Sequence, residues 1–350
     1  MTTLRMPPAK GMLHLWSVAS GRMISTALFL LLGITEAGSP ELSIGAAVRL
    51  AACGPSEADH VRIETLLRGA TYDHLGGGFH DMPGGPKRLE TNAWYLNALS
   101  AAYEAKPDLF VRNMALDIVA FVLRDLKDGV GAFFRSLGNE GTSAYFSFSE
   151  AEIRAALGPD KSREFFLNFA LSAGGFPRLT GSPFAGLADT RQTLLLRRLR
   201  RVRLPLDDTL DPDANGLWVA ALSRTATALG RHDLMEAARR AAGAISRSKD
   251  GGAAGAAFGF AALEHFDPGQ MPADVVSRAL DRAIETSQAA SAVDLSTIAM
   301  ALAHTLRAHP SETRKRQLSR LMREIERRFP DTEALTAARC AAATAVAKAP

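Results

Sequence analysis

The chain has 350 residues, of which 47% are hydrophobic and 22% are charged, and its formal net charge at pH 7 is +4. These values are typical of globular proteins and leave ample length for a large core, in one all-helical domain or in two domains. The densest basic cluster, between Arg197 and Arg203, contains no aromatic residue, which argues against a nucleic-acid-binding protein and favours a solvated or ion-paired segment.

An apolar segment from Met23 to Ile34 follows three basic residues near the amino terminus. It is shorter than the ~20 residues that an ordinary membrane-spanning helix needs. Small residues around Ala37 suit a cleavage site, so residues 1–38 are predicted to be a secretory signal peptide or a short membrane anchor. A signal predicts an exported or periplasmic protein. A buried helix in this segment would instead leave the protein in the cytoplasm.

Beyond Pro40 the sequence is helical in pattern nearly throughout, because apolar residues recur at steps of three and four. We count about a dozen helical segments joined by short loops, which is typical of antiparallel helix hairpins. The clearest apolar stripes are Phe110, Met114, Ile118, Phe121 and Val122; Leu295, Ile298, Leu302 and Leu306; and Leu318, Leu321, Met322, Ile325 and Phe329.

Local signals place several helix boundaries. Ser149 with Glu152 predicts a capping box, and Asp211 followed by Pro212 predicts an N-cap with proline in the first helical position. Ser56 also suits a helix start. Glycines suit helix ends at Gly54, Gly158 and Gly230.

Strand signals are few, and the clearest is the alternation of aromatic and small residues in Ala144–Phe148. Together with Ala132–Phe134 it predicts one short β-hairpin. Residues 173–189 are rich in glycine, proline and serine and predict a long surface loop. The only cysteines, Cys53 and Cys340, form no CxxC motif and lie in alanine-rich helical contexts. A small buried side chain is the favoured interpretation of each, with a single disulfide left open.

The segment from Tyr72 to His80 is the most informative part of the chain. Gly76, Gly77 and Gly78 are adjacent, and such a run indicates a sharp turn with close backbone approach. Tyr72, Asp73 and His80 flank it, so polar side chains would converge at the end of a helix.

This segment resembles the carboxyl-terminal helical domain of the thioredoxin-domain family that includes spermatogenesis-associated protein 20. The matching residues are Tyr72–Asp73 and Leu75–His80, and a second match is Arg201–Asp208 followed by Asn215–Leu217. A third stretch, Phe133–Ile153, resembles the family segment that leads to a Glu-Ile helix. The likeness runs from about residue 40 to about residue 241.

The resemblance implies an all-α fold, an (α/α)6 toroid of helix hairpins over residues 39–350, complete or incomplete, like that of six-hairpin glycosidases and sugar epimerases. In such folds the ends of the inner helices form a funnel that binds carbohydrate. Because the family's own activity is not established, an enzymatic function rests on fold analogy alone. The chain also departs from the family: the thioredoxin-like domain is missing, Thr209 replaces a lysine, and Ala214 replaces a tryptophan.

Four residues are candidates for catalysis: Asp73, His80, Glu90 and Asp208. A carboxylate beside a histidine raises the proton affinity of the ring and suits a general base. Two carboxyl groups, one protonated and one ionised, suit glycoside hydrolysis. The alternative is structural, with Asp73 capping backbone N–H groups and His80 packed and hydrogen-bonded.

Six further residues are candidates for ligand binding. An aromatic face suits the C–H face of a sugar, and glycine allows close approach, although core packing, helix capping and the helix dipole also explain these residue types. The six are Tyr72, Gly77, Gly78, Trp94, Asp207 and Asn215. No motif for a metal or a cofactor is present, so neither is predicted.

Three hypotheses about function follow. The first is a degenerate, non-catalytic protein that keeps a ligand-binding funnel, because several polar groups of the family motifs are replaced. The second is a carbohydrate-active enzyme, either a glycoside hydrolase or a sugar epimerase. The third is a partner module for a separate thioredoxin-like protein, since that domain is missing from this chain.

Overall fold

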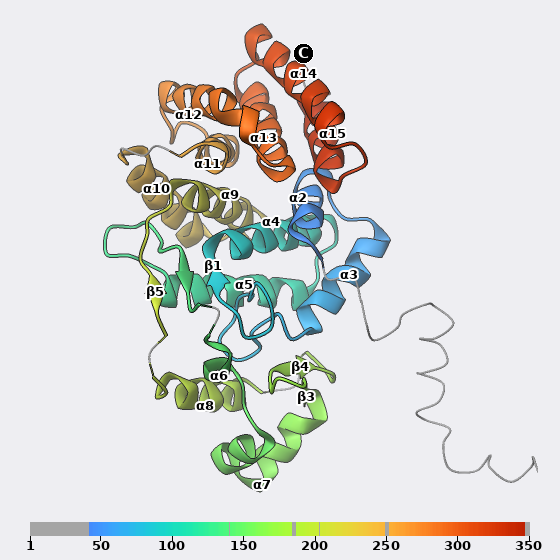
Figure 1. The fold of residues 1–350 in the computed structure, drawn as a ribbon, viewed down its shortest axis with the longest axis vertical. Helices are drawn as coiled ribbons and strands as arrows, with labels where there is room; N and C mark the ends of the chain where they lie inside the picture. The colour runs from blue at the N-terminus through green and yellow to red at the C-terminus, as the bar shows by residue number, and fades with distance from the viewer. Residues whose placement is uncertain (1–41, 140, 184–186, 203, 249–251, 347–350) are drawn as a thin grey trace, which may run out of the picture. The chain divides into compact units, whose positions relative to one another are not determined.

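The computed structural model describes residues 42–139, 141–183, 187–202, 204–248 and 252–346. Within these ranges the chain is all-α with a few very short strands, as the sequence predicts (Figure 1). No described helix combines the length and the hydrophobicity needed to cross a bilayer. The segment 1–38, predicted to be an export signal, lies outside the described residues.

Six helices form a closed ring, in which each packs on the next and the last packs back on the first. Figure 1 shows α15, near the carboxyl terminus, returning beside α2. The ring helices are, in order, α2 (Ile44–Cys53), α4 (Leu89–Ala105), α9 (Pro212–Leu229), α11 (Ala254–Phe266), α13 (Ala292–Ala308) and α15 (Glu333–Val346). This closure confirms the predicted toroid from the packing itself.

Outer helices alternate with the ring helices along the chain and complete the hairpins. α5 packs on α4, α10 on α9, α12 on α11, and α14 on both α13 and α15. The outer helices are α3 (Glu57–Arg68), α5 (Leu109–Asp125), α10 (His232–Ser246), α12 (Ala273–Glu285) and α14 (Glu312–Arg328), with a short 3-10 helix η1 (Thr286–Ala289) after α12. Five hairpins are therefore complete in the described residues, and α15 is the sixth ring helix.

The ring helices are buried more completely than the outer helices, because they have other helices on more sides. Every residue of α11 from Ala254 to Leu263 is buried, because other helices surround a ring helix. On the outer helix α14 only Leu318, Leu321 and Ile325 are buried, which is the core of the predicted stripe. Glycines bring α9 and α11 together: a Cβ on Gly216 would collide with the backbone oxygen of Gly255.

An insertion between α5 and α9 carries the remaining elements. These are β2 (Ser136–Leu137), α6 (Ser143–Phe146), α7 (Glu150–Asn168), β3 (Phe169–Leu171), β4 (Pro177–Leu179), α8 (Ala188–Leu199) and β5 (Leu206–Asp207). β1 (Lys87–Arg88) pairs antiparallel with β2, and β2 with β5, so that Leu137 lies opposite both Lys87 and Leu206. This sheet links the segment before α4 to the segment before α9 through β2, which lies between them.

Several predicted boundaries are confirmed, and one predicted element is wrong. Ser149 and Glu152 form the capping box, Asp211 caps α9, and Gly230 ends it in the left-handed conformation. Ala144–Phe146, predicted as a strand, is the helix α6, because a helical turn lets Phe146 pack with Phe176 and Leu204. A short hairpin does form, but between β3 and β4, within and beside the predicted loop.

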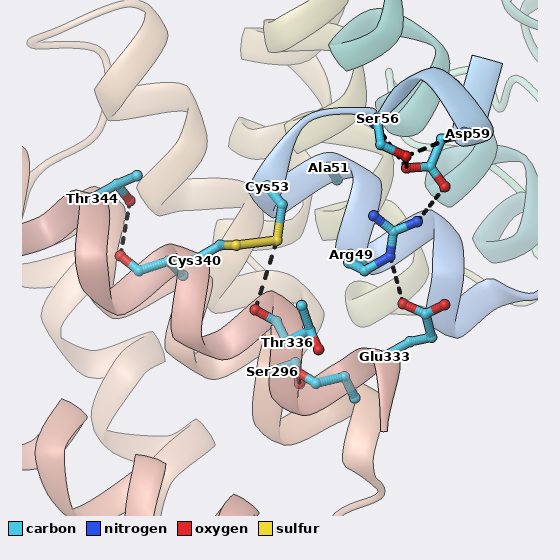
Figure 2. Close-up of a disulfide and its surroundings, with 12 residues drawn as sticks. Arg49, Ala51, Cys53, Ser56, Asp59, Ser296, Glu333, Thr336, Cys340 and Thr344 are labelled. Carbon is cyan, nitrogen blue, oxygen red and sulfur yellow. Dashed lines mark hydrogen bonds and ion pairs between the residues drawn. A yellow bond between two sulfur atoms is a disulfide. The ribbon is translucent and has the colours of Figure 1, made fainter. Parts of the chain in front are cut away.

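A disulfide between Cys53 and Cys340 joins α2 to α15, with their Cα atoms 5.2 Å apart (Figure 2). The favoured interpretation of the cysteines as small buried side chains is therefore wrong. The physical reason is ring closure, which brings together two positions 287 residues apart in the sequence. Arg49 of α2 also links these two helices by pairing with Glu333 of α15 at 2.5 Å, and it pairs with Asp59 of α3 at 2.5 Å.

Candidate functional site

The glycine run forms the sharp turn that the sequence predicts. Gly77 and Gly78 have φ of +73° and +79°, a region that residues with a side chain rarely adopt. Both also lie against α5: a Cβ on Gly77 would collide with the backbone oxygen of Asp117, and one on Gly78 with the ring of Phe121. The two glycines predicted to bind a ligand therefore allow the turn to pack directly against α5.

Asp73 lies at the centre of a buried ionic network. Its Oδ1 accepts hydrogen bonds from the backbone N–H groups of Leu75 (3.1 Å) and Gly76 (3.0 Å). Arg198 of α8 donates to both carboxylate oxygens, at 2.9 and 2.7 Å, and Lys87 Nζ donates to Oδ2 at 3.0 Å. Burial by itself raises the pKa of Asp73, but Arg198 and Lys87 outweigh burial and hold the pKa well below its ordinary value. The carboxylate is therefore ionised throughout the neutral range.

His80 and Lys87 belong to the same buried layer. His80 Nδ1 lies 2.7 Å from the carbonyl oxygen of Gly85, so it is the protonated nitrogen that donates. Burial, assisted by the positive charge of Lys87, lowers the pKa of His80 to about 4. Burial also lowers the pKa of Lys87 to about 8, and its ammonium lies 3.7 Å from the centre of the Phe121 ring. His80 is thus a neutral residue near pH 7, with one nitrogen committed to the backbone.

Two asparagines near the starts of ring helices each form a pair of hydrogen bonds with the backbone of one loop residue. Asn215 accepts from the N–H of Phe133 and donates to its carbonyl, both at 2.8 Å. Asn92 on α4 does the same for Phe79, at 2.7 and 3.0 Å. Both side chains are buried. The structure therefore uses Asn215, a predicted binding residue, to hold a loop, and the equivalent role of Asn92 was not found from the sequence.

The other candidates lie in different surroundings. Tyr72 is buried with its hydroxyl 3.5 Å from Asp117, and Trp94 is buried in the ring and stacks on Phe258. Asp207 lies in β5, where a hydrogen bond from Thr209 lowers its pKa, and Asp208 beside it is exposed.

Glu90 lies in the first turn of α4, away from the Asp73 network. Glu90 is exposed, yet partial burial raises its pKa, and the nearby carboxylates Asp294 of α13 and Asp211 before α9 raise it further. Three ring helices thus place carboxylates at their amino-terminal ends. The four predicted catalytic residues occupy three surroundings: Asp73 and His80 in a buried layer, Glu90 among these carboxylates, and Asp208 in solvent.

A central cavity of about 220 Å³ opens among the ring helices towards their carboxyl-terminal ends. Each of the six ring helices contributes to its wall. The contributing residues include Ala51, Glu104, Arg224, His265, Arg307 and Thr344, in ring order. Sequence reasoning missed this site, because single arginines and histidines on separate helices form no motif until the ring closes.

The charged groups of the central cavity are unevenly paired. Arg224 donates to Glu104 Oε2 at 2.6 and 3.0 Å and to the carbonyl of Ala51 at 2.6 Å. Within the described residues Arg307 forms no hydrogen bond or ion pair, and its Nε is buried. Burial, assisted by Arg224, lowers the pKa of Arg307 from its ordinary value. His304 has a buried Nδ1 without a described partner, and burial holds its pKa well below the ordinary value.

A second cavity, of about 160 Å³, lies against the ionic network of Asp73. Its wall includes Lys87, Arg198, Arg124 and Tyr145. The two basic groups that reach it from the network already pair with Asp73, and Arg124 pairs with Asp125. Three cations, Lys87, Arg198 and Arg124, thus share two carboxylates, Asp73 and Asp125. One positive charge is in excess, but each cation has a carboxylate partner, unlike Arg307 in the central cavity.

No protein-family model matches the sequence, and no curated protein is significantly similar to it. Solved structures with a similar fold include an inactive variant of alpha-1,6-mannanase GH76A of Salegentibacter sp. HEL1_6 in complex with alpha-1,6-mannotriose. It is 9% identical, covers 92% of this chain and 81% of its own, and has a TM-score of 0.40. A second variant of that enzyme, with alpha-1,6-mannotetrose, is 9% identical over 92% and 79%, with a TM-score of 0.39.

Cellobiose 2-epimerase from Spirochaeta thermophila DSM 6192 is also similar in fold. It is 13% identical, covers 77% of this chain and 90% of its own, and has a TM-score of 0.34. At these scores no side chain's role carries over to this chain. The kinship with the thioredoxin-domain family is not supported by the comparisons and stays a prediction.

Proposed function

We propose that the protein is a non-catalytic binding protein that holds a small molecule in the central cavity. The observation that carries this proposal is the unpaired, partly buried Arg307 in a cavity walled by all six ring helices. Leaving a buried donor without an acceptor costs ~1–3 kcal/mol. Such an unsatisfied group calls for a partner, and a bound small molecule would supply one.

The state of the glycine turn supports the absence of catalysis there. Asp73 is held ionised by Arg198 and Lys87, so it has no proton to donate as a general acid. His80 is neutral, and its Nδ1 is committed to Gly85. Both residues match the structural alternative, in which the turn stabilises the fold and the ancestral site chemistry is lost.

The proposed location is an oxidising compartment outside the cytoplasm. Disulfides persist in exported proteins and are rare in the cytosol. The Cys53–Cys340 bond, together with the apolar amino-terminal segment, supports export. In a reducing compartment the exposed Cys53 would leave this bond open to reduction.

A carbohydrate-active enzyme is the second candidate, with its site at the amino-terminal ends of the ring helices. The observation that favours it is the raised pKa of Glu90 beside Asp211 and Asp294. Glycoside hydrolysis uses one protonated and one ionised carboxyl group, and a carboxyl with a raised pKa near two other carboxylates suits the acid. In this alternative Glu90 is the acid, and Asp73, His80 and Asp208 take no part.

A pair of variants on one helix tests the central cavity. Thr344 lines it, whereas Thr336, two turns earlier on α15, is exposed outside it. We expect Thr344→Phe to abolish binding in a thermal-shift screen of sugars and small organic acids, and Thr336→Phe to leave binding intact. Equal binding by both variants would refute the central cavity as the site. Sugar turnover that disappears in Glu90→Gln, with folding unchanged, would replace the proposal with the enzyme.

A further inference from the structure

The charge balance of the central cavity is positive. Its wall holds two guanidinium groups, Arg224 and Arg307, and one carboxylate, Glu104. Glu104 is already paired with Arg224. His304 is uncharged at neutral pH, because burial holds its pKa well below the ordinary value. One full positive charge, that of Arg307, therefore has no counter-charge within the described residues.

The helix dipole alone does not account for Arg307. Cations are favoured in the last turn of a helix, and Arg307 is in the last turn of α13. That interaction is weak for a partly exposed group. Leaving a buried donor without an acceptor costs more, and more again for a charged group. The cost of the unpaired donor exceeds the gain from the dipole, so an added anion would stabilise this arrangement.

The rest of the wall suits a small apolar body. Phe258 presents a ring that stacks on Trp94, with centroids 5.9 Å apart and planes 16° apart. Met300 and several alanines complete the apolar part. A volume of about 220 Å³ is below the ~300–1,000 Å³ of sites for drug-sized ligands, which limits the occupant to a small molecule.

We infer that the central cavity binds a small organic anion, with its carboxylate or phosphate on Arg307 and its apolar face against Phe258; this inference rests on the proposed function. A guanidinium matches either anion with two parallel hydrogen bonds. His304 lies 5.8 Å from Phe258 between ring centres and offers its buried Nδ1 as a further polar contact. Carboxylate and phosphate share this chemistry, and the experiment separates them.

Three probes of similar shape test the inference by isothermal titration calorimetry on the full chain. Benzoate carries a carboxylate, phenyl phosphate carries a phosphate, and benzamide is the neutral counterpart of benzoate. We expect at least one anion to bind about tenfold or more tightly than benzamide, since a hydrogen bond to a charged group is stronger than one between neutral groups. The tighter anion identifies which of the two groups the site prefers.

Matched arginine variants assign the effect to one side chain. Arg307→Gln is expected to weaken the preferred anion about tenfold or more. Arg307→Lys keeps the charge but loses the planar fork, so it should fall between Gln and the unchanged protein. Arg320, exposed on α14, is the control, and Arg320→Gln should not change the affinity.

The outcomes separate this inference from the proposed function. Benzamide binding as tightly as the anions, or full anion affinity in Arg307→Gln, would overturn anion recognition while the central cavity remained a binding site. Anion binding that persists in Thr344→Phe would overturn the central cavity itself. If none of the three probes binds, the inferred ligand class is wrong.

Discussion

Arg198 and Asp73 meet face to face in the interior, each guanidinium Nη bonded to one carboxylate oxygen, at 2.9 and 2.7 Å. The two residues are 125 positions apart and join the insertion helix α8 to the glycine turn. Lys87 completes the network from β1. Because all three groups are buried, each charge depends on the others for its counter-charge.

Asp73→Asn should therefore destabilise the protein severely, by ~3–5 kcal/mol, because it leaves Arg198 and Lys87 buried without a carboxylate. Asp208→Asn, at an exposed position, should change stability by less than ~0.5 kcal/mol. Urea unfolding at pH 7 measures both. Similar stabilities for the two variants would contradict a structural role for Asp73.

Reduction of the disulfide should lower the stability of the fold, because it removes the covalent link between α2 and α15, where the ring closes. Breaking the Cys53–Cys340 link frees a very long loop in the unfolded chain, and native disulfides are worth ~2–5 kcal/mol. We expect dithiothreitol to lower the melting temperature of the unchanged protein. The double variant Cys53→Ser/Cys340→Ser should melt at the lower temperature whether or not the reductant is added. A melting temperature insensitive to dithiothreitol would show that the bond contributes nothing.

Two glycine substitutions separate backbone strain from close approach. Gly54 and Gly77 both have positive φ, +76° and +73°, but only Gly77 faces another backbone group, the Asp117 carbonyl. Gly54→Ala should cost ~1–3 kcal/mol from the backbone conformation alone, because φ +76° with ψ 168° is a region that only glycine adopts readily. Gly77→Ala should cost clearly more, since α5 must also move. Denaturant unfolding of both variants measures the loss of unfolding free energy. Equal losses in the two variants would show that the turn does not pack tightly against α5.

Acid should destabilise the fold well before the carboxylates titrate. Burial lowers the pKa of His74 and of His80 to about 4, and the pKa of His304 lies well below its ordinary value. Between these values and about 6.5, the unfolded chain binds more protons than the folded one, so stability rises with pH. From pH 7.5 to 5.5, His74 and His80 should each cost about 1.4 kcal/mol.

The histidine effect is checked by urea unfolding at pH 7.5 and 5.5. His80→Gln should remove one histidine's share of the acid loss, because glutamine does not titrate. His232→Gln, at an exposed position on α10, is the control and should leave the acid loss unchanged. A loss of stability that is the same in both variants would contradict the burial of His80 as a neutral ring.

Arg307 should limit the stability of the protein without a ligand. If its guanidinium is an uncompensated charge, Arg307→Gln should raise the melting temperature of the ligand-free protein while weakening anion binding. Arg320→Gln should change neither quantity. Differential scanning calorimetry measures the first effect, and a lower melting temperature for Arg307→Gln would indicate that Arg307 has a structural partner instead.

Much of the local structure was predictable from the sequence, because it depends on neighbours along the chain. The capping box at Ser149, the N-cap at Asp211 and the helix end at Gly230 each involve residues within a few positions. The glycine turn was predictable for the same reason, since three glycines in a row permit backbone angles that other residues avoid. The all-α class follows from the same local periodicity.

The roles of single side chains depended on the tertiary structure. Asp73 is held ionised because Arg198 reaches it from a distant helix. Cys53 is bonded because the ring closes on Cys340. The central cavity exists only where six separate helices meet, so no local pattern marks Arg307 as part of it. Short-range propensities act within a turn of chain, whereas pairing of charges and closure of a ring depend on which distant segments pack together.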